Sequence, residues 1–208
     1  MEHTVNRVQL RGTLVALPVF SHENHARRFY RFALEVERLS GAVDVLPVLA
    51  AEDVLNDMEL FSGSRIAVTG QIRSFNSRAE SGRRLILSVY AESLDTSDLP
   101  PENDVQLTGA ICKTPVYRRT PLGREICDVM LAVSRLYRRS DYIPCILWGR
   151  AAQQAALLAP GAVLELEGRM QSRNYTKLLP TGAEQRTAYE VSATQAWLDG
   201  ENLQEFGL

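Results

Sequence analysis

The sequence predicts an all-β protein built from two tandem barrels, each interrupted by one short helix. Three observations in its 208 residues predict this fold. The second half of the chain repeats the first half block by block, the repeated blocks alternate apolar and polar residues, and one helical segment interrupts each copy. A chain of this length has room for two domains of ordinary size.

The internal repeat defines the expected domain boundaries. The block Asn-Arg-Val-Gln-Leu-Arg-Gly at residues 6–12 recurs at 103–109 as Asn-Asp-Val-Gln-Leu-Thr-Gly, and the block at 70–76 recurs at 168–174. Matched blocks in the same order indicate a duplicated unit and not a chance similarity. The predicted parts are a first barrel at 1–95, a polar Pro-Pro linker at 96–102, a second barrel at 103–198 and a short acidic tail at 199–208.

The repeated blocks are predicted strands. Val8, Leu10 and Leu14 point to one side of the first block, and polar residues point to the other. This period of two is typical of half-buried β-strands, and each copy offers about five such segments. Glycines such as Gly70 and Gly168 fall on the inward face, where a closed barrel bends sharply.

One helix is expected in each copy, at 51–60 and at 150–159. Ala151, Ala155 and Leu158 would share one face of the second helix. Three strands, a helix and two further strands are the order of an OB-fold. A generic β-sandwich is the alternative, and the helix between the third and fourth strands argues against it.

Motifs of the second copy resemble the bacterial single-stranded-DNA-binding protein family. The motifs are Asn103-x-Val-x-Leu-x-Gly109, Ile146-Leu-Trp-Gly149 and Gly161-x-x-Leu-x-Leu-x-Gly168. The first copy matches less completely and lacks the aromatic third strand. The resemblance implies binding of single-stranded DNA during replication, recombination or repair, contacts with replication or repair proteins, and a homodimer that presents four OB barrels.

The resemblance also implies that four aromatic residues face the DNA. Sequence-independent binding needs flat rings on which any base can stack, and cations that follow the phosphates. Tyr142 and Trp148 are six residues apart, so one strand would present both on the same face. The alternative is that both pack against a neighbouring domain or under a loop. The four implied positions are Tyr137, Tyr142, Trp148 and Tyr175.

Basic residues accompany these aromatics. The whole chain has a net charge of −2, but residues 103–198 contain twelve Lys and Arg against eight Asp and Glu, a net charge of +4. A binding groove needs a local positive field and not a basic whole protein. The candidate nucleic-acid-binding residues of the second copy, besides the aromatics, are Arg118, Arg119, Arg135, Arg138, Arg139, Arg150, Arg173 and Lys177.

The first copy is predicted to bind DNA more weakly and to serve assembly. The positions that match the four aromatics are Ser40, Val45, Ala51 and Ser77. Phe75 and Arg73 are its candidate DNA contacts, with further arginines at 78, 83 and 84. A mobile loop is expected from His22 to Arg28, where Arg27 and Arg28 would touch phosphates. The tail at 199–208 is expected to fray, with partner docking as the alternative.

Several classes of protein are not indicated. The three histidines lie near the start without a catalytic neighbour, and the three cysteines lack metal-ligand spacing, so we expect no enzyme, no cofactor and no metal. The cysteines are expected to be small buried residues. The chain lacks an apolar run of membrane-spanning length and a signal-peptide pattern, which predicts a cytoplasmic, nucleoid-associated protein. The competing functions are a primosomal replication protein of the same superfamily and an OB-fold interaction scaffold.

Overall fold

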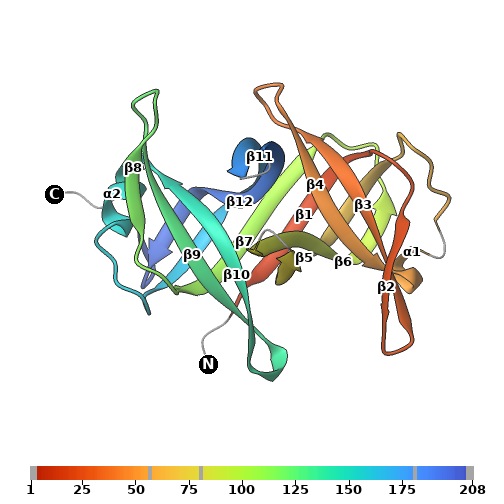
Figure 1. Cartoon of the computed structure of the whole chain (residues 1–208), viewed down its shortest axis with the longest axis horizontal. Coiled ribbons are helices and arrows are strands. Elements are labelled where there is room, and N and C mark those ends of the chain that lie inside the picture. The colour runs from red at the N-terminus through yellow and green to blue at the C-terminus, as the bar shows by residue number, and fades with distance from the viewer. Residues whose placement is uncertain (1–3, 56–57, 80–81, 180–181, 205–208) are drawn as a thin grey trace.

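The structure is a computed structural model that describes residues 4–55, 58–79, 82–179 and 182–204. It contains two barrels placed side by side (Figure 1). In barrel 1, the elements are β1 (Asn6–Leu14), β2 (Val19–Asn24), β3 (Arg27–Glu37), β4 (Val43–Ala51), α1 (Glu52–Leu55), β5 (Arg65–Ala79) and β6 (Gly82–Thr96). In barrel 2, they are β7 (Glu102–Ile111), β8 (Val116–Arg119), β9 (Glu125–Arg135), the 3-10 turn η1 (Leu136–Arg138), β10 (Arg139–Trp148), α2 (Gly149–Ala155), β11 (Val163–Leu179), β12 (Gly182–Leu198) and β13 (Glu201–Asn202).

Each barrel closes by the same strand pairings. In barrel 1, β1 pairs with both β3 and β5, and the circuit runs on through β4 and β6, which are parallel to each other. In barrel 2, β7 pairs with β9 and β11, and the circuit runs on through β10 and β12, again a parallel pair. The inward positions are apolar and buried, as the alternation predicts. Two tandem OB barrels with one short helix each are therefore the observed fold.

The in-strand glycines lie where neighbouring strands approach most closely. A Cβ atom on Gly70 would lie 2.0 Å from the backbone oxygen of Tyr90, and one on Gly168 would lie 2.3 Å from that of Ser192. The pairing register shifts at both glycines, so each marks a β-bulge. Only a residue without a side chain lets the long strands β5 and β11 bend around their barrels here.

The predicted helices are shorter than expected. Helix α1 spans four residues where a helix was expected over 51–60, and residues 56–57 lie outside the described part of the chain. Helix α2 ends at Ala155, and Leu158 follows the turn at residues 156–157. Ala51 belongs to strand β4, where it pairs with Phe29 of β3, and its side chain is fully buried in the barrel.

The expected mobile loop from His22 to Arg28 is instead a β-hairpin, so that prediction is wrong. Strand β2 pairs with β3 across a two-residue turn at His25 and Ala26, both of which have positive φ angles, 50° and 58°. Positive φ at both central positions matches the right-handed twist of a hairpin. The usual Asn-Gly or Asp-Gly signal is absent, which is why the sequence pattern did not reveal the turn.

The first six residues of the tail are also ordered, and the expectation of fraying is wrong for them. A tight turn at Asp199 and Gly200 folds the chain back, so that β13 pairs with the end of β12. Leu203 is buried, and the Gln204 amide donates to the backbone oxygen of Thr194 over 3.0 Å. Apolar burial of Leu203 fixes this segment, and residues 205–208 lie outside the described part.

The two barrels share one continuous sheet. Strands β1 and β7 pair antiparallel from Asn6 opposite Leu107 to Arg11 opposite Glu102, and an ion pair of 3.1 Å joins Arg11 to Glu102. Each first strand is also fixed in its own barrel by an asparagine. The Asn6 amide exchanges two hydrogen bonds of 2.9 Å with the backbone of Ile72. Asn103 makes the corresponding two hydrogen bonds with the backbone of Met170, so the repeated asparagine has the same role in both barrels.

A reciprocal clasp also joins the barrels, and we call it the Asp–Ser clasp. The backbone N–H of Ser74 in barrel 1 donates to Asp141 of barrel 2 over 2.7 Å. Conversely, the backbone N–H of Ser172 in barrel 2 donates to Asp44 of barrel 1 over 2.8 Å. Both aspartates are fully buried. Because the four residues occupy repeated positions, the clasp has the symmetry of the internal duplication.

No helix in the described part of the chain is both long and apolar enough to cross a membrane.

Candidate nucleic-acid interface

Tyr137 lies at the tip of the hairpin that joins β9 and β10. Its side chain is 93% exposed, and its backbone has φ 62° and ψ 36°, the left-handed region. Leu136 beside it is 82% exposed. The tip therefore presents an aromatic ring and an aliphatic side chain to solvent.

Tyr142 and Trp148 lie on the same face of β10. Tyr142 is 44% exposed and Trp148 is half-buried, while Ile143, Cys145 and Leu147 between them are buried in the barrel. Six residues of strand separate the two rings by about 20 Å, a span of several nucleotides. The strand thus carries two outward aromatics over an apolar inner row, as the sequence predicted.

Trp148 has a defined environment at the end of β10. Its indole N–H donates to the hydroxyl of Ser192 over 2.9 Å, which fixes the ring plane against β12. The ring borders a shallow hollow of about 430 Å³ that also contains basic side chains. The other residues of the hollow are Arg119, Gly123, Arg124, Glu125 and Gly149.

Tyr175 lies on β11, away from β10. It is half-buried, and the guanidinium of Arg173 lies 5.8 Å from the centre of its ring. Arg173 is also within 3.8 Å of Glu190 on β12. The candidate aromatics are therefore spread over the β9–β10 hairpin and β11, and none of the four is sealed in the core.

Carboxylates hold two candidate arginines of the β8–β9 hairpin. Arg118 forms an ion pair of 2.6 Å with Asp128, and Arg119 forms one of 3.0 Å with Glu125. The hydrogen bond that Arg118 donates to Asp128 raises the pKa of Arg118. Both arginines remain substantially exposed, at 45% and 70%. A phosphate must compete with these carboxylates, which lowers what each contact contributes to binding.

Two other candidates belong to the contact between the barrels. Arg73 and Arg135 lie 3.1 Å and 3.3 Å from the buried carboxylate of Asp141, one from each barrel. Since Asp141 is fully buried, its charge requires these partners. Arg73 and Arg135 therefore compensate the buried negative charge of Asp141 in the Asp–Ser clasp, a role that the sequence analysis missed.

The remaining candidate cations of barrel 2 are less constrained. Within the described residues, Arg139, Arg150 and Lys177 make no ion pair, and the two arginines are exposed. The side chain of Arg138 lies outside the described part. In barrel 1, Phe75 is 53% exposed on β5, whereas the side chains of the arginines at 78, 83 and 84 lie outside the described part.

Barrel 1 carries an aromatic cluster that position-by-position matching missed. Ala51 takes the place of Trp148, and Tyr90 takes the place of Ser192, so the large ring has moved to the neighbouring strand. Phe29 lies 6.3 Å from the ring of Tyr90. The large ring of this strand pair therefore lies on β6 in barrel 1 and on β10 in barrel 2.

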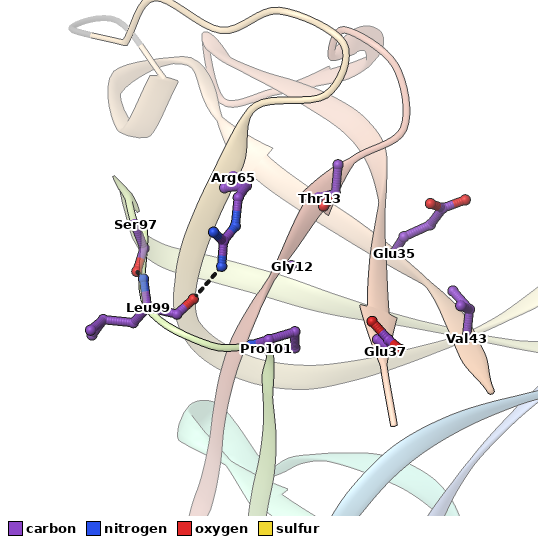
Figure 2. Close-up of a pocket in the computed structure, with 9 residues that line it drawn as sticks. All are labelled: Gly12, Thr13, Glu35, Glu37, Val43, Arg65, Ser97, Leu99 and Pro101. Atoms are coloured by element: carbon purple, nitrogen blue, oxygen red, sulfur yellow. Dashed lines mark hydrogen bonds between the residues drawn. The ribbon is translucent and has the colours of Figure 1, made fainter. Parts of the chain in front are cut away.

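A small pocket between barrel 1 and the linker is chemically different (Figure 2). Arg65 donates over 2.6 Å to the backbone oxygen of Leu99 and fixes the linker there. Glu35 and Glu37 line the same pocket of about 140 Å³. Two carboxylates disfavour a phosphate, so this pocket is not part of the candidate interface.

Residues 102–198 match the model of the "Single-strand binding protein family". Over 80 residues, the chain is 35% identical to "Single-stranded DNA-binding protein B" of Bacillus subtilis (strain 168), a match that covers 71% of that protein and 35% of this chain. The chain belongs to the single-strand binding protein family. Other members of the family include "Single-stranded DNA-binding protein 2" of Listeria innocua, 38% identical over 80 residues that cover 35% of this chain and 50% of that protein.

The chain spans about half the length of the first curated relatives it matches. A solved family structure, the wild-type single-stranded DNA binding protein from Thermus aquaticus, resembles the chain with a TM-score of 0.77 at 22% identity. That similarity covers 95% of this chain and 94% of the other, so it includes both barrels and supports the tandem fold.

Proposed function

We propose that the protein binds single-stranded DNA without sequence preference, mainly through barrel 2. The observation that carries this proposal is the set of four solvent-accessible aromatics on barrel 2, at the positions that the family resemblance assigns to DNA contact. Each base stacked on such a ring contributes roughly 1–3 kcal/mol, and stacking tolerates any base. Arg139, Arg150 and Lys177 would accompany the phosphates.

Binding is tested by titrating fluorescein-labelled oligo-dT with the full chain and following its fluorescence anisotropy. Trp148→Ala should weaken binding by about tenfold, because one stack of about 1.4 kcal/mol is lost. Trp197→Phe on β12 is the matched control for loss of a tryptophan and should bind as the unmodified chain does. Phe75→Ala should have a smaller effect than Trp148→Ala, because we propose that barrel 1 contributes little stacking.

The salt dependence tests the electrostatic part of the proposal. The logarithm of the binding constant should fall with the logarithm of salt concentration, with a slope of about −0.7 for each phosphate neutralised. Duplex DNA should compete poorly. A salt-independent titration, or equal loss of affinity in Phe75→Ala and Trp148→Ala, would contradict the proposal.

We further propose that the protein acts in the cytoplasm in replication, recombination or repair, as a homodimer that presents four barrels. The tandem fold supports this assembly, because one chain already supplies two barrels joined by one sheet. Light scattering of the full chain should give twice the mass of one chain, and a monomer at micromolar concentration would contradict it.

A further inference from the structure

A second groove, of about 1100 Å³, lies on barrel 1 between strands β2–β4 and the β5–β6 hairpin. Its lining is mostly apolar. Leu17, Val19 and Phe75 in this lining are each more than half exposed, at 54%, 53% and 53%. Apolar side chains gathered at one hollow and left open to solvent are typical of an interaction site.

Barrel 2 provides an internal comparison, because the same fold carries different residues there. The position of Leu17 is taken by Thr114 in barrel 2, and the position of Phe75 is taken by Arg173. The two copies therefore differ at these two positions, where barrel 1 has apolar residues and barrel 2 has a polar or a basic one, whereas Val19 is matched by the exposed Val116. Because the barrel cores stay alike, the difference concerns what each surface binds and not how each barrel folds.

The aromatic rings of this groove offer little surface for nucleobases. Phe29 is buried and has the imidazole of His22 stacked on it, with ring centres 4.9 Å apart. Tyr90 has the guanidinium of Arg73 over its ring at 5.8 Å. Among the described lining residues, Phe75 is the aromatic residue that remains more than half exposed. Aliphatic side chains, which dominate the exposed lining, cannot stack with bases.

The charged groups of the groove have one sign. Arg31, Arg73 and Arg135 belong to its lining, and none of the described lining residues is a carboxylate. Arg73 and Arg135 share Asp141, whereas Arg31 is exposed on β3 and makes no ion pair with any described residue. Val19 lies opposite Arg31 on the paired strand. An apolar surface and an available cation thus occur side by side.

We propose that this groove binds an extended polypeptide segment of a partner protein that carries aliphatic side chains and carboxylates. Aliphatic side chains would pack on Leu17, Val19 and Phe75, and a carboxylate would pair with Arg31. None of the four candidate aromatics of barrel 2 is among the described residues that line the groove, but the groove adjoins them at Ser74, whose hydroxyl accepts from the backbone N–H of Tyr142 over 2.7 Å. It does not depend on the function proposed above.

The test uses a library of random peptides displayed on phage and selected on the immobilised full chain. Enriched sequences should combine Asp or Glu with Leu, Ile or Val. An enriched peptide is then labelled with fluorescein and its affinity measured by anisotropy. Leu17→Asp and Arg31→Glu should each weaken it about tenfold or more through like-charge repulsion and lost apolar contact. Leu157→Asp, at a position 81% exposed beyond helix α2, is the control and should leave the affinity unchanged.

Four results would overturn the proposal. Selection of basic peptides would show that the groove does not prefer acidic, aliphatic segments. Selection of the same peptides on the Leu17→Asp protein would show that they bind elsewhere. Loss of oligo-dT affinity in Leu17→Asp equal to that in Trp148→Ala would make the groove a nucleic-acid site. A lower mass of Leu17→Asp in light scattering would make a second copy of the chain the occupant. Circular dichroism should show both variants folded, since Leu17 and Arg31 are exposed.

Discussion

At the scale of single residues, Tyr137 combines strain with exposure. A bulky residue with φ of 62° is uncommon, and the left-handed conformation costs roughly 1–2 kcal/mol for a residue with a Cβ atom. Nothing in the described structure packs on its ring, which is 93% exposed. The hairpin tip therefore holds the ring in solvent at a cost in stability, as expected of a residue kept for a binding role.

Replacing Tyr137 with Asn should separate stability from binding. Asn tolerates the left-handed conformation, so Tyr137→Asn should raise the free energy of unfolding by up to about 1 kcal/mol. The same change should weaken oligo-dT binding, because a stacking ring is lost. Urea denaturation and the fluorescence titration measure the two effects. Leu136→Asn, at the neighbouring exposed position, should not stabilise the protein, and equal stabilisation by both variants would contradict the role of strain.

Burial determines the pKa values of the three cysteine thiols. Burial raises the pKa of Cys127 to about 11 and raises the pKa of Cys145 further. Cys112 is half-buried, contrary to the expectation that all three are buried. Its pKa is also raised, so none of the three thiols is activated as a nucleophile.

At the scale of elements, the bulged glycines control the bend of the long strands. Gly168→Ala should destabilise the protein by about 1–3 kcal/mol, because the added methyl group must displace the backbone of Ser192. Thermal unfolding by calorimetry measures the loss. Gly123→Ala is a control for a glycine whose Cβ would meet open space. It should cost less than Gly168→Ala despite its positive φ of 77°, and the reverse order would contradict close packing as the cause.

The sequence predicted the strands well, because the alternation of apolar and polar residues is a local pattern. It predicted contacts between distant segments poorly. The alternation around Val8 and Val105 gave the barrel strands, because one face of each strand is buried. The β2–β3 turn escaped prediction because His25 and Ala26 are not typical turn residues. The exchange of Trp148 for Tyr90 escaped it because matching by position cannot see a neighbouring strand. Ion pairs such as Arg73 with Asp141 join residues far apart in sequence. The sequence therefore identified the candidate cations but did not show which of them are paired with carboxylates.

At the scale of the whole molecule, the Asp–Ser clasp makes the stability of the contact between the two barrels depend on pH. Burial alone would raise the pKa of Asp44, but hydrogen bonds from Arg38 and Ser172 outweigh it and lower the pKa below its ordinary value. A lowered pKa means that the charged carboxylate stabilises the fold above the ordinary pKa of an aspartate. This stabilisation is lost as the pH falls through the lowered value.

Asp44→Asn should therefore destabilise the protein at neutral pH, by about 3 kcal/mol, since Arg38 keeps a partly buried charge without its partner. The variant should also show a flatter loss of stability in acid than the unmodified chain. Urea denaturation across a pH series measures both. Asp98→Asn, an exposed linker position, is the control and should reproduce the unmodified pH profile. A parallel acid profile in Asp44→Asn would contradict a role for this carboxylate.

The antiparallel pairing of β1 with β7 has a consequence for a chain that has been cut. Those backbone hydrogen bonds run directly from one half to the other and do not need the covalent connection at residues 97–101. A specific protease site inserted there should yield two fragments that co-elute in size-exclusion chromatography and separate only in denaturant. The halves would then behave as a heterodimer encoded by a single polypeptide.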